Sequence, residues 1–238
     1  MNWKPGKNMV GGFTQNDGTI DFYLRINSLI DDTSIVLDLG AGRASWYEDD
    51  LCITRRDIRL LKGKVRQLIA ADVDEVVLSN RSSDKQIVIN DGKLDLESDQ
   101  VDLIVADYVL EHIDDPKAFF DQIDSCLRSG GWFCARTPHR YSYVAIVASI
   151  VANRLHSKFL RFIQPERREI DVFPTLYKFN RMRDIKSTFS EWDNFSFIYR
   201  SEPAYYFGKS VIFKLLSFLH RIMPSFLFGN LFVFVKKP

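Results

Sequence analysis

The chain alternates short apolar runs with longer amphipathic stretches. Five apolar runs are bounded by polar residues or glycine, at 35–39, 65–71, 86–89, 101–106 and 132–136. Such runs are typical of buried parallel strands. The stretches between and before them predict helices at 20–30, 46–61, 75–80 and 117–127. Because strands alternate with helices, the pattern predicts an α/β fold in which helices cover a mostly parallel sheet.

The C-terminal part of the chain is less regular. Its pattern predicts helices at 182–192 and 209–223 and strands at 195–200 and 231–235. Between the two parts, residues 143–162 are apolar and then basic, and residues 165–179 predict an ordered loop. These elements extend the α/β pattern, and no internal repeat interrupts it.

A single domain at 19–238 accounts for this order of elements. Residues 1–18 are rich in glycine, asparagine, lysine and aspartate and predict a mobile N-terminal arm. Within the domain we expect a cofactor-binding core at 19–140 and a substrate or lid insertion at about 141–180. A C-terminal sheet edge with a helix in 205–223 completes the expected domain.

Composition narrows the class of protein. The chain has 238 residues, of which 46% are hydrophobic and 26% charged, so a globular core is expected rather than disorder. The net charge of +1 offers no global attraction for nucleic acid. Three widely spaced cysteines without a C-x-x-C pair predict reduced thiols in a cytoplasmic protein and no metal site. The apolar stretches at 144–152 and 211–219 are shorter than the ~20 residues of a membrane span.

The first apolar run carries the most informative motif. It contains Asp38 and breaks into Gly40, Ala41 and Gly42 before a predicted helix. A strand, a glycine turn and a helix open many nucleotide-binding sheets. The dinucleotide pattern G-x-G-x-x-G needs a third glycine, but Ser45 stands at that position. The carboxylate of Asp38 instead suits a ligand with a positive charge, such as an amino group or a sulfonium.

Polar residues at the next strand ends describe the rest of that ligand. Asp72 can accept two hydrogen bonds from a ribose diol. Asp91 is placed to accept a hydrogen bond from an adenine amine, with the backbone of Gly92 beside it. A molecule with an adenine, a ribose with free hydroxyls and a cationic amino-acid end, but no phosphate, is S-adenosylmethionine.

At this point the chain resembles a known family. The segments VLDLGAGRA, AADVD, NDG, VDLIVADYVLEHIDDP and LRSGGWFCARTPH look like the successive motifs of class I S-adenosylmethionine-dependent methyltransferases, in the subgroup that acts on small molecules. The likeness spans about residues 20–140. It implies a Rossmann-like, doubly wound sheet of seven strands, mostly parallel, with the last strand antiparallel. In this resemblance, Ala44 stands where the family usually has a third glycine.

The resemblance also implies roles for single residues. Gly40 and Gly42 let the backbone approach the methionine part of the cofactor, with Asp38 near its amino group. Asp72, rather than Asp74, binds the ribose. The remaining cofactor and substrate contacts implied are Asp91, Gly92 and Val73 at the adenine, and Asp107 and Tyr108 beside the sulfonium and the substrate.

Residues for catalysis and for the acceptor are less marked. His139 and His112 are candidates for acid–base chemistry, because a neutral imidazole can take up a proton near pH 7. Tyr143, Arg167 and Tyr177 are candidates for substrate binding. For each of these residues a structural contact or a solvated surface position is the alternative interpretation.

The expected function is methyl transfer from S-adenosylmethionine to a small or lipid-linked acceptor. Three alternatives stay open: an NAD-dependent oxidoreductase, a non-catalytic cofactor-binding module of the same fold, and a peripheral membrane protein attached through 205–223. The last alternative arises because the predicted helix at 209–223 is apolar apart from one polar stripe. The acceptor and the oligomeric state have no signature in the sequence.

Overall fold

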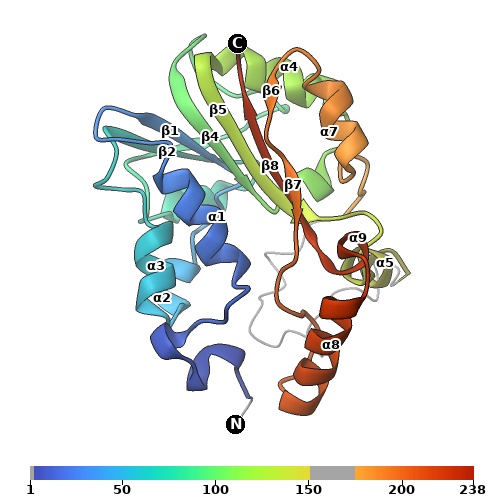
Figure 1. Cartoon of the computed structure of the whole chain (residues 1–238). Helices are drawn as coiled ribbons and strands as arrows, with labels where there is room; N and C mark the ends of the chain where they lie inside the picture. Colours follow the sequence, from blue (N-terminus) through green and yellow to red (C-terminus); the bar gives the residue numbers. More distant parts are fainter. Residues whose placement is uncertain (1–2, 151–174) are drawn as a thin grey trace.

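A single mixed sheet organises the molecule. The computed structural model describes residues 3–150 and 175–238, and these residues form eight strands in the order β3-β2-β1-β4-β5-β8-β6, with β7 also paired to β8 (Figure 1). The strands are β1 Ile35–Leu39, β2 Gln67–Asp72, β3 Lys85–Val88, β4 Val101–Asp107, β5 Leu127–Pro138, β6 Asp193–Asn194, β7 Phe197–Tyr199 and β8 Asn230–Lys236.

The direction of the strands confirms the predicted Rossmann-like sheet. The strands β1 to β5 pair in parallel, and β8 runs antiparallel to β5. The chain order reverses at β1, which has β2 on one side and β4 on the other. In open sheets of this kind, ligands bind beside such a switch point, outside the carboxyl ends of the strands.

Helices cover both faces of the sheet. The α-helices are α1 Gly18–Asn27, α2 Trp46–Asp49, α3 Ile53–Arg59, α4 Pro116–Cys126, α5 Tyr143–Ile150, α7 Met182–Thr188, α8 Ser210–Ile222 and α9 Ser225–Phe228. The 3₁₀ helices are η1 Pro5–Asn8, η2 Val10–Gly12, η3 Glu75–Ser79 and η4 Leu110–His112. In Figure 1, α1 and α3 lie on one face, α4 and α7 lie on the other, and α8 projects away from the sheet.

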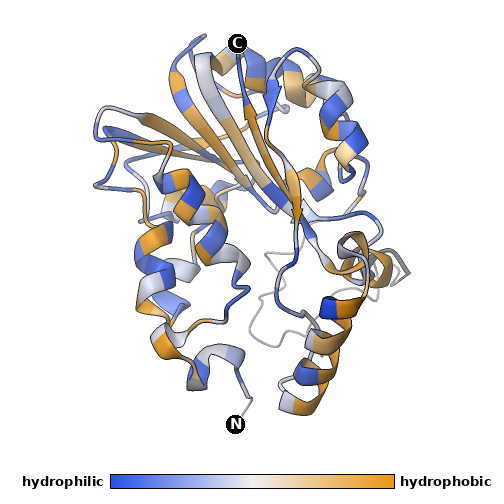
Figure 2. Ribbon diagram, viewed as in Figure 1, coloured by the Kyte–Doolittle hydropathy of each residue, from blue (hydrophilic) through white to orange (hydrophobic). Residues whose placement is uncertain are grey.

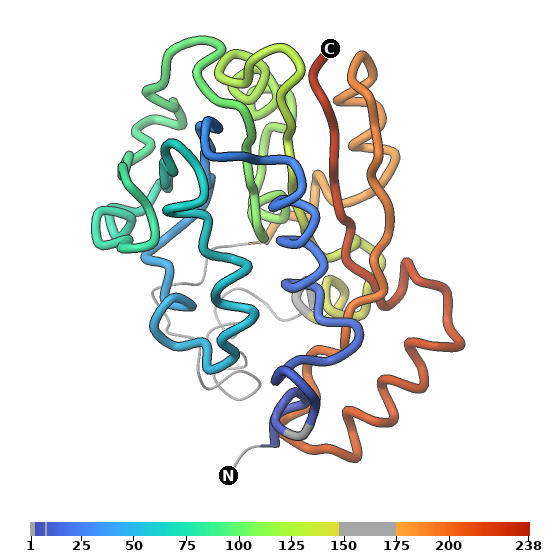
Figure 3. Tube along the Cα trace, turned by 60° about the vertical axis from the view of Figure 1, so that its left-hand side comes forward, coloured from blue at the N-terminus to red at the C-terminus, as the bar shows by residue number. Residues whose placement is uncertain are grey.

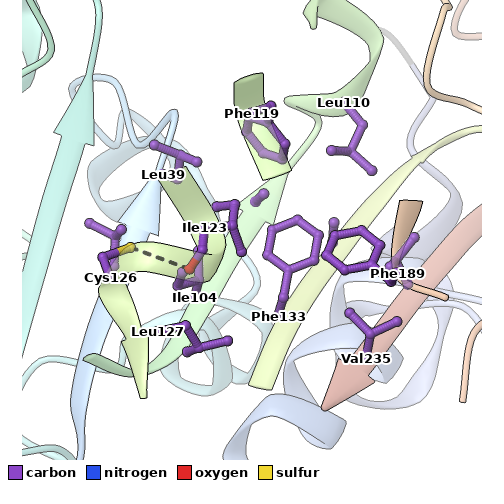
Figure 4. Packing of buried hydrophobic residues seen from close by; sticks show 14 of the residues in the cluster. Leu39, Ile104, Leu110, Phe119, Ile123, Cys126, Leu127, Phe133, Phe189 and Val235 are labelled. Atoms are coloured by element: carbon purple, nitrogen blue, oxygen red, sulfur yellow. Dashed lines mark hydrogen bonds between the residues drawn. The ribbon is translucent and has the colours of Figure 1, made fainter. Parts of the chain in front are cut away.

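Two apolar cores follow from the alternation of side chains along the strands. In β1, Val36 belongs to the core under α1 and α3, whereas Leu37 belongs to the core under α4 and α7. The central strands of the sheet are accordingly coloured mainly as hydrophobic in Figure 2. Figure 4 shows the second core, where Phe119 of α4 packs against Phe133 of β5 at 6.0 Å between ring centroids. Burial on both faces explains why the strands read as continuous apolar runs.

The predicted helix at 46–61 is wrong in one respect, because it is broken into α2 and α3. The Asp50 side chain accepts a hydrogen bond from the backbone N–H of Cys52 at 2.9 Å and binds Arg55 at 2.6 Å. An aspartate that bonds the backbone two residues ahead favours a turn over a continuous helix. Arg55 also reaches Asp17 at 2.5 Å, so the break joins this segment to the start of α1.

The predicted strand at 195–200 is present only as β7, and the short strand β6 lies just before the predicted range. The Asn194 side chain accepts the N–H of Ser196 at 2.9 Å, and the Ser196 hydroxyl accepts the N–H of Phe234 at 3.2 Å. These side-chain bonds interrupt the regular ladder between β6 and β7, although the backbone N–H of Phe195 still donates to the carbonyl oxygen of Phe234 at 2.9 Å. Each of the seven predicted strands has a counterpart in the structure. The eighth strand is counted because the interruption separates β6 from β7.

The described part of the N-terminal arm packs against the C-terminal half of the chain. The backbone N–H of Trp3 donates to Gly208 at 3.1 Å, and the Trp3 ring lies 5.1 Å from the ring of Phe213. The Thr14 hydroxyl donates to Glu202 at 2.5 Å. Figure 3 shows the arm beside the segment that leads into α8. Mobility of this arm stays a prediction.

Candidate functional site

A cavity of about 1460 Å³ opens at the carboxyl edge of the sheet. It is lined by the loops that follow the parallel strands, by the arm, and by residues 201–208. The residues predicted from sequence that line it are Gly40, Gly42, Asp72, Val73, Gly92, Asp107, Tyr108, His112, Tyr143 and Tyr177. Asp38, Asp91 and His139 are not part of this lining, and Arg167 lies outside the described residues.

The glycine turn after β1 depends on the absence of side chains. Gly40 has a φ of +69°, and a Cβ there would lie 2.4 Å from a methyl carbon of Val109. Gly42 has a φ of +51°, and Ala44 adopts a φ of +52° in place of the third glycine. Positive φ is disfavoured for residues with a Cβ. Gly40 therefore leaves room for Val109, Gly42 leaves the backbone clear beside Asp72, and the turn accepts some strain at Ala44.

Asp72 connects this turn to the end of β2. One carboxylate oxygen accepts the N–H of Gly42 at 2.9 Å, and the other accepts the N–H of Asp74 at 3.0 Å. The residue is 7% exposed and faces the cavity. Each carboxylate oxygen can accept two hydrogen bonds. Asp72 thus holds the loop in place and retains acceptor capacity for a diol.

Asp38 lies half-buried one residue before Leu39, which lines the cavity. Burial, helped by the neighbouring carboxylates of Asp107 and Asp72 and opposed by Arg59, raises its pKa to about 7. No hydrogen bond from the described residues offsets this burial. A cation placed beside Asp38 would therefore stabilise the ionised carboxylate.

The end of β3 forms a tight turn. Asp91 and Gly92 both have positive φ, at +51° and +68°, and Asn90 bridges to Lys93. Gly92 lines the cavity, whereas Asp91 is exposed outside it. Val73 lines the cavity from the loop after β2 and is 60% exposed, so an apolar surface faces the cavity there.

Asp107, at the end of β4, is the centre of a buried charge network. Arg136 donates to both of its oxygens at 2.5 and 3.0 Å, and both side chains are 5% exposed. Arg59 lies 3.4 Å away, and the Tyr23 hydroxyl donates at 3.3 Å. Burial alone would raise the pKa of Asp107, but Arg136 and Arg59 hold it below its usual value. Asp107 therefore lines the cavity as an anion that is already paired.

Three predicted tyrosines reach the cavity from different elements. Tyr108 follows β4 with a φ of +62°, and its hydroxyl accepts a hydrogen bond from Asn230 at 3.0 Å. The Tyr143 hydroxyl donates to the carbonyl oxygen of Ala204 at 2.9 Å and accepts its N–H at 2.7 Å. Tyr177 is 7% exposed. Tyr108 and Tyr143 therefore form parts of the wall whose hydroxyls are held by the protein.

The comparison with known sequence families decides what kind of protein this is. A family model described as a methyltransferase domain matches residues 15–188, which is more than half of the chain. The chain belongs to this methyltransferase family. The family predicted from the ordered motifs is confirmed. No curated protein sequence matches the methyltransferase.

Solved structures share the fold of this methyltransferase at low sequence identity. A chain of the complex that contains the Haloferax volcanii Trm112 methyltransferase activator is 17% identical, with a TM-score of 0.54 over 93% of this chain and 92% of that chain. An S-adenosylmethionine-dependent methyltransferase from Archaeoglobus fulgidus is 14% identical, with a TM-score of 0.53 over 92% of each chain. The geranyl diphosphate C-methyltransferase of Streptomyces coelicolor A3(2) is 10% identical, with a TM-score of 0.56 over 93% of this chain and 76% of that chain.

The two histidines predicted near the methyltransferase site, and Glu111 beside one of them, occupy different environments. His112 lines the cavity. His139 is 6% exposed and packs between the rings of Tyr141 and Phe226. Glu111, next to His112, accepts the Thr137 hydroxyl at 2.7 Å and so ties the loop after β4 to β5.

His220 is a further histidine at the cavity, and the sequence did not predict it. His220 of α8 lines the cavity although it is only 4% exposed. Its Nδ1 lies 2.9 Å from the carbonyl oxygen of Ser201 and must donate to it, because a carbonyl can only accept. Nε2 is buried without a hydrogen-bond partner among the described residues. The sequence shows His220 only as one polar position on an apolar helix, so no local signal marks it.

Proposed function

We propose that this methyltransferase transfers the sulfonium methyl group of S-adenosylmethionine to a small or lipid-linked acceptor. The observation that carries the proposal is Asp72, a buried carboxylate that faces the cavity at the end of β2 and keeps acceptor capacity for a ribose diol. The cofactor, when bound, supplies an electrophilic methyl group to an O, N or C nucleophile.

The chain's own residues account for binding and orientation. The open backbone at Gly40 and Gly42 admits the methionine part, and Asp38 attracts its ammonium group. Val73 packs on the adenine beside Gly92. Pockets for one ligand are typically ~300–1,000 Å³, so the cavity of about 1460 Å³ has room for the cofactor and an acceptor together. Orientation of the two in one cavity can contribute several kcal/mol to the rate, up to about 7–11 kcal/mol.

Calorimetry with three ligands tests the proposal against the oxidoreductase alternative. We expect binding of S-adenosylmethionine and of its demethylated product, and no binding of NAD. The missing third glycine at Ser45 and the acid at Asp38 argue against a dinucleotide. Tight NAD binding without binding of the other two ligands would reject the proposal. Transfer of labelled methyl groups into a cell extract then separates an enzyme from an inert binding module.

The raised pKa of Asp38 predicts a pH dependence of cofactor affinity. Only the ionised carboxylate attracts an ammonium group, so affinity should rise about tenfold from pH 5.5 to 7.0, the range below the raised pKa of about 7. The α-amino group of the ligand stays protonated throughout this range. Asp38→Asn should bind more weakly at pH 7 and lose the dependence. Calorimetry at several pH values measures both, and a pH-independent affinity of the unchanged protein contradicts the assignment.

The same shift has a consequence for stability. Because the folded state holds the Asp38 proton up to about pH 7 whereas the unfolded chain releases it near pH 4, Asp38 makes folding less favourable as pH rises between these values. In Asp38→Asn this loss is absent. Urea unfolding of both proteins at pH 5 and pH 8 should therefore show the variant gaining relative stability at the higher pH.

His220 is the proposed proton acceptor for an O–H or N–H nucleophile. Its Nδ1–H is held by Ser201, so the free lone pair is on Nε2, which is buried in the cavity wall without a hydrogen-bond partner among the described residues. Burial lowers its pKa, which keeps the ring neutral and able to accept the proton that the nucleophile loses as the methyl group arrives. Methylation thus transfers the methyl group to the acceptor and one proton to Nε2.

The variant His220→Gln tests this role. We expect a fall in turnover of about 10²–10⁴-fold with unchanged cofactor affinity, because general-base catalysis contributes about that factor. Labelled methyl transfer into an extract and calorimetry measure the two effects. His112→Gln and His139→Gln are made in parallel, and a loss of turnover confined to one of them would move the role to that residue.

A further inference from the structure

Helix α8 presents two opposite faces. Its buried residues are Phe213 and His220, which face the body of the protein. The other face carries an apolar stripe, at i, i+4, i+7 and i+11, with exposed fractions of 76% for Val211, 58% for Leu215, 58% for Phe218 and 61% for Ile222. This is the spacing of one face of a helix. The stripe is therefore a continuous apolar surface in contact with solvent.

The apolar surface continues beyond both ends of α8. Phe207 precedes the helix and is 42% exposed, while Met223 and Phe226 follow it and are 37% and 41% exposed. In Figures 1 and 2 the helix projects from the domain with alternating hydrophobic and hydrophilic bands. Extended apolar patches of this kind mark interaction sites on soluble proteins.

The charge around the stripe has one sign. Residues 203–238 contain no aspartate or glutamate. Lys209, Lys214 and Arg221 are all exposed, and they lie on α8 or immediately before it. An amphipathic helix with basic residues beside an apolar face binds the surface of anionic bilayers, where each cation adds to the attraction. An acidic surface is therefore the complement of this face.

We propose that α8 docks on an anionic lipid bilayer, with the stripe Val211, Leu215, Phe218 and Ile222 inserted at the level of the headgroups. Within the described residues, no helix has both the length and the apolar character needed to cross a bilayer. The helix therefore lies along the surface rather than spanning it.

The position of the cavity gives the docking a consequence. His220, on the face opposite the stripe, and Tyr205 to Gly208, just before α8, line the cavity. A docked α8 thus lies between the bilayer and this wall of the cavity, one helix diameter (~10 Å) from the headgroups. Resting on the proposed methyl transfer, this placement selects an acceptor whose reactive group is carried on a membrane lipid, because docking brings the cavity close to the headgroups and an extended headgroup can reach around α8.

Sedimentation with vesicles tests the docking. Vesicles of phosphatidylcholine with phosphatidylglycerol are compared with vesicles of phosphatidylcholine alone. We expect the full chain to bind the anionic vesicles, and the double variant Leu215→Ser/Phe218→Ser to lose at least about tenfold in affinity. Lys214→Glu/Arg221→Glu should weaken binding to a similar degree at low salt. At high salt this variant should bind like the unaltered chain, because salt screens the attraction to anionic lipid.

Matched controls separate the stripe from general effects. Leu24 of α1 has an exposed fraction of 57%, nearly the same as that of Leu215. The Arg81 side chain is 78% exposed. Leu24→Ser and Arg81→Glu should leave vesicle binding unchanged. Absence of binding by the unaltered chain, or equal binding by all variants, would overturn the proposal. A dimer of the unaltered chain that the stripe variants convert to a monomer would also overturn it, because the stripe would then be a subunit interface.

The acceptor is tested separately from the docking. Calorimetry with S-adenosylmethionine on the stripe variants should give unchanged affinity, so that loss of docking is not confused with failure of the proposed function. Labelled methyl groups should then appear in the organic extract of membranes. Label confined to the aqueous fraction, with cofactor binding intact, would reject the lipid-linked acceptor.

Discussion

Arg136→Met should destabilise the protein by about 3–5 kcal/mol, because it leaves the buried carboxylate of Asp107 without its principal partner. The pair is 5% exposed on both sides and is bidentate. Arg59, at 3.4 Å, supplies only part of the compensation. Urea unfolding followed by circular dichroism measures the change.

An exposed pair between the same two strands is the matched control. Arg128 of β5 binds Asp102 of β4 at 2.5 Å, but the Arg128 side chain is 59% exposed. Arg128→Met should therefore cost about 1 kcal/mol or less. The double variant Arg136→Met/Asp107→Asn should recover part of the loss, since no buried charge is then left unpaired. A loss below about 1 kcal/mol for Arg136→Met would mean that Arg59 alone satisfies Asp107.

Asp72→Ala should reduce cofactor affinity about 100-fold or more. Two hydrogen bonds from a diol to a buried carboxylate are lost, at about 1.5–3 kcal/mol for each bond to a charged group. The change also removes the bond from Gly42 at 2.9 Å, which loosens the glycine turn. Calorimetry with S-adenosylmethionine measures the affinity, and circular dichroism checks that the variant is folded.

Asp74→Ala is the control for this prediction. Asp74 lies two residues further on, and its side chain caps η3 by accepting the N–H of Val76 at 2.9 Å. Its loss should cost about 1 kcal/mol of stability and leave cofactor affinity within about threefold. An unchanged affinity of Asp72→Ala, or an equal loss in Asp74→Ala, would remove Asp72 from the cofactor site.

Local sequence information reached its limit at element boundaries. The break between α2 and α3 depends on the Asp50 side chain, and the interruption between β6 and β7 depends on Ser196 bonding to Phe234. Both are side-chain bonds that compete with regular structure. The hydrophobic pattern does not reveal these two side-chain bonds, because the apolar residues on either side of each break keep their regular spacing.

The sequence by itself determined the α/β class, the order of the first five strands and the family. Burial on both faces of a parallel sheet requires short apolar runs. A ligand at the strand ends requires glycines and carboxylates at those positions. Both requirements are therefore visible in the amino-acid sequence. Gly40, Gly42 and Asp72 were predicted in this way, and all three line the cavity.

Only the tertiary structure decided which partners the charged and polar residues have. Asp107 was predicted beside the substrate, but its carboxylate is already paired with Arg136, which is 29 positions away. His220 enters the cavity because Ser201 holds its Nδ1 and the rest of α8 turns the stripe outward. Contacts between distant segments depend on how the elements pack, and no local pattern encodes them. The physical reason is that a side chain's role is set by its neighbours in space, which folding alone brings together.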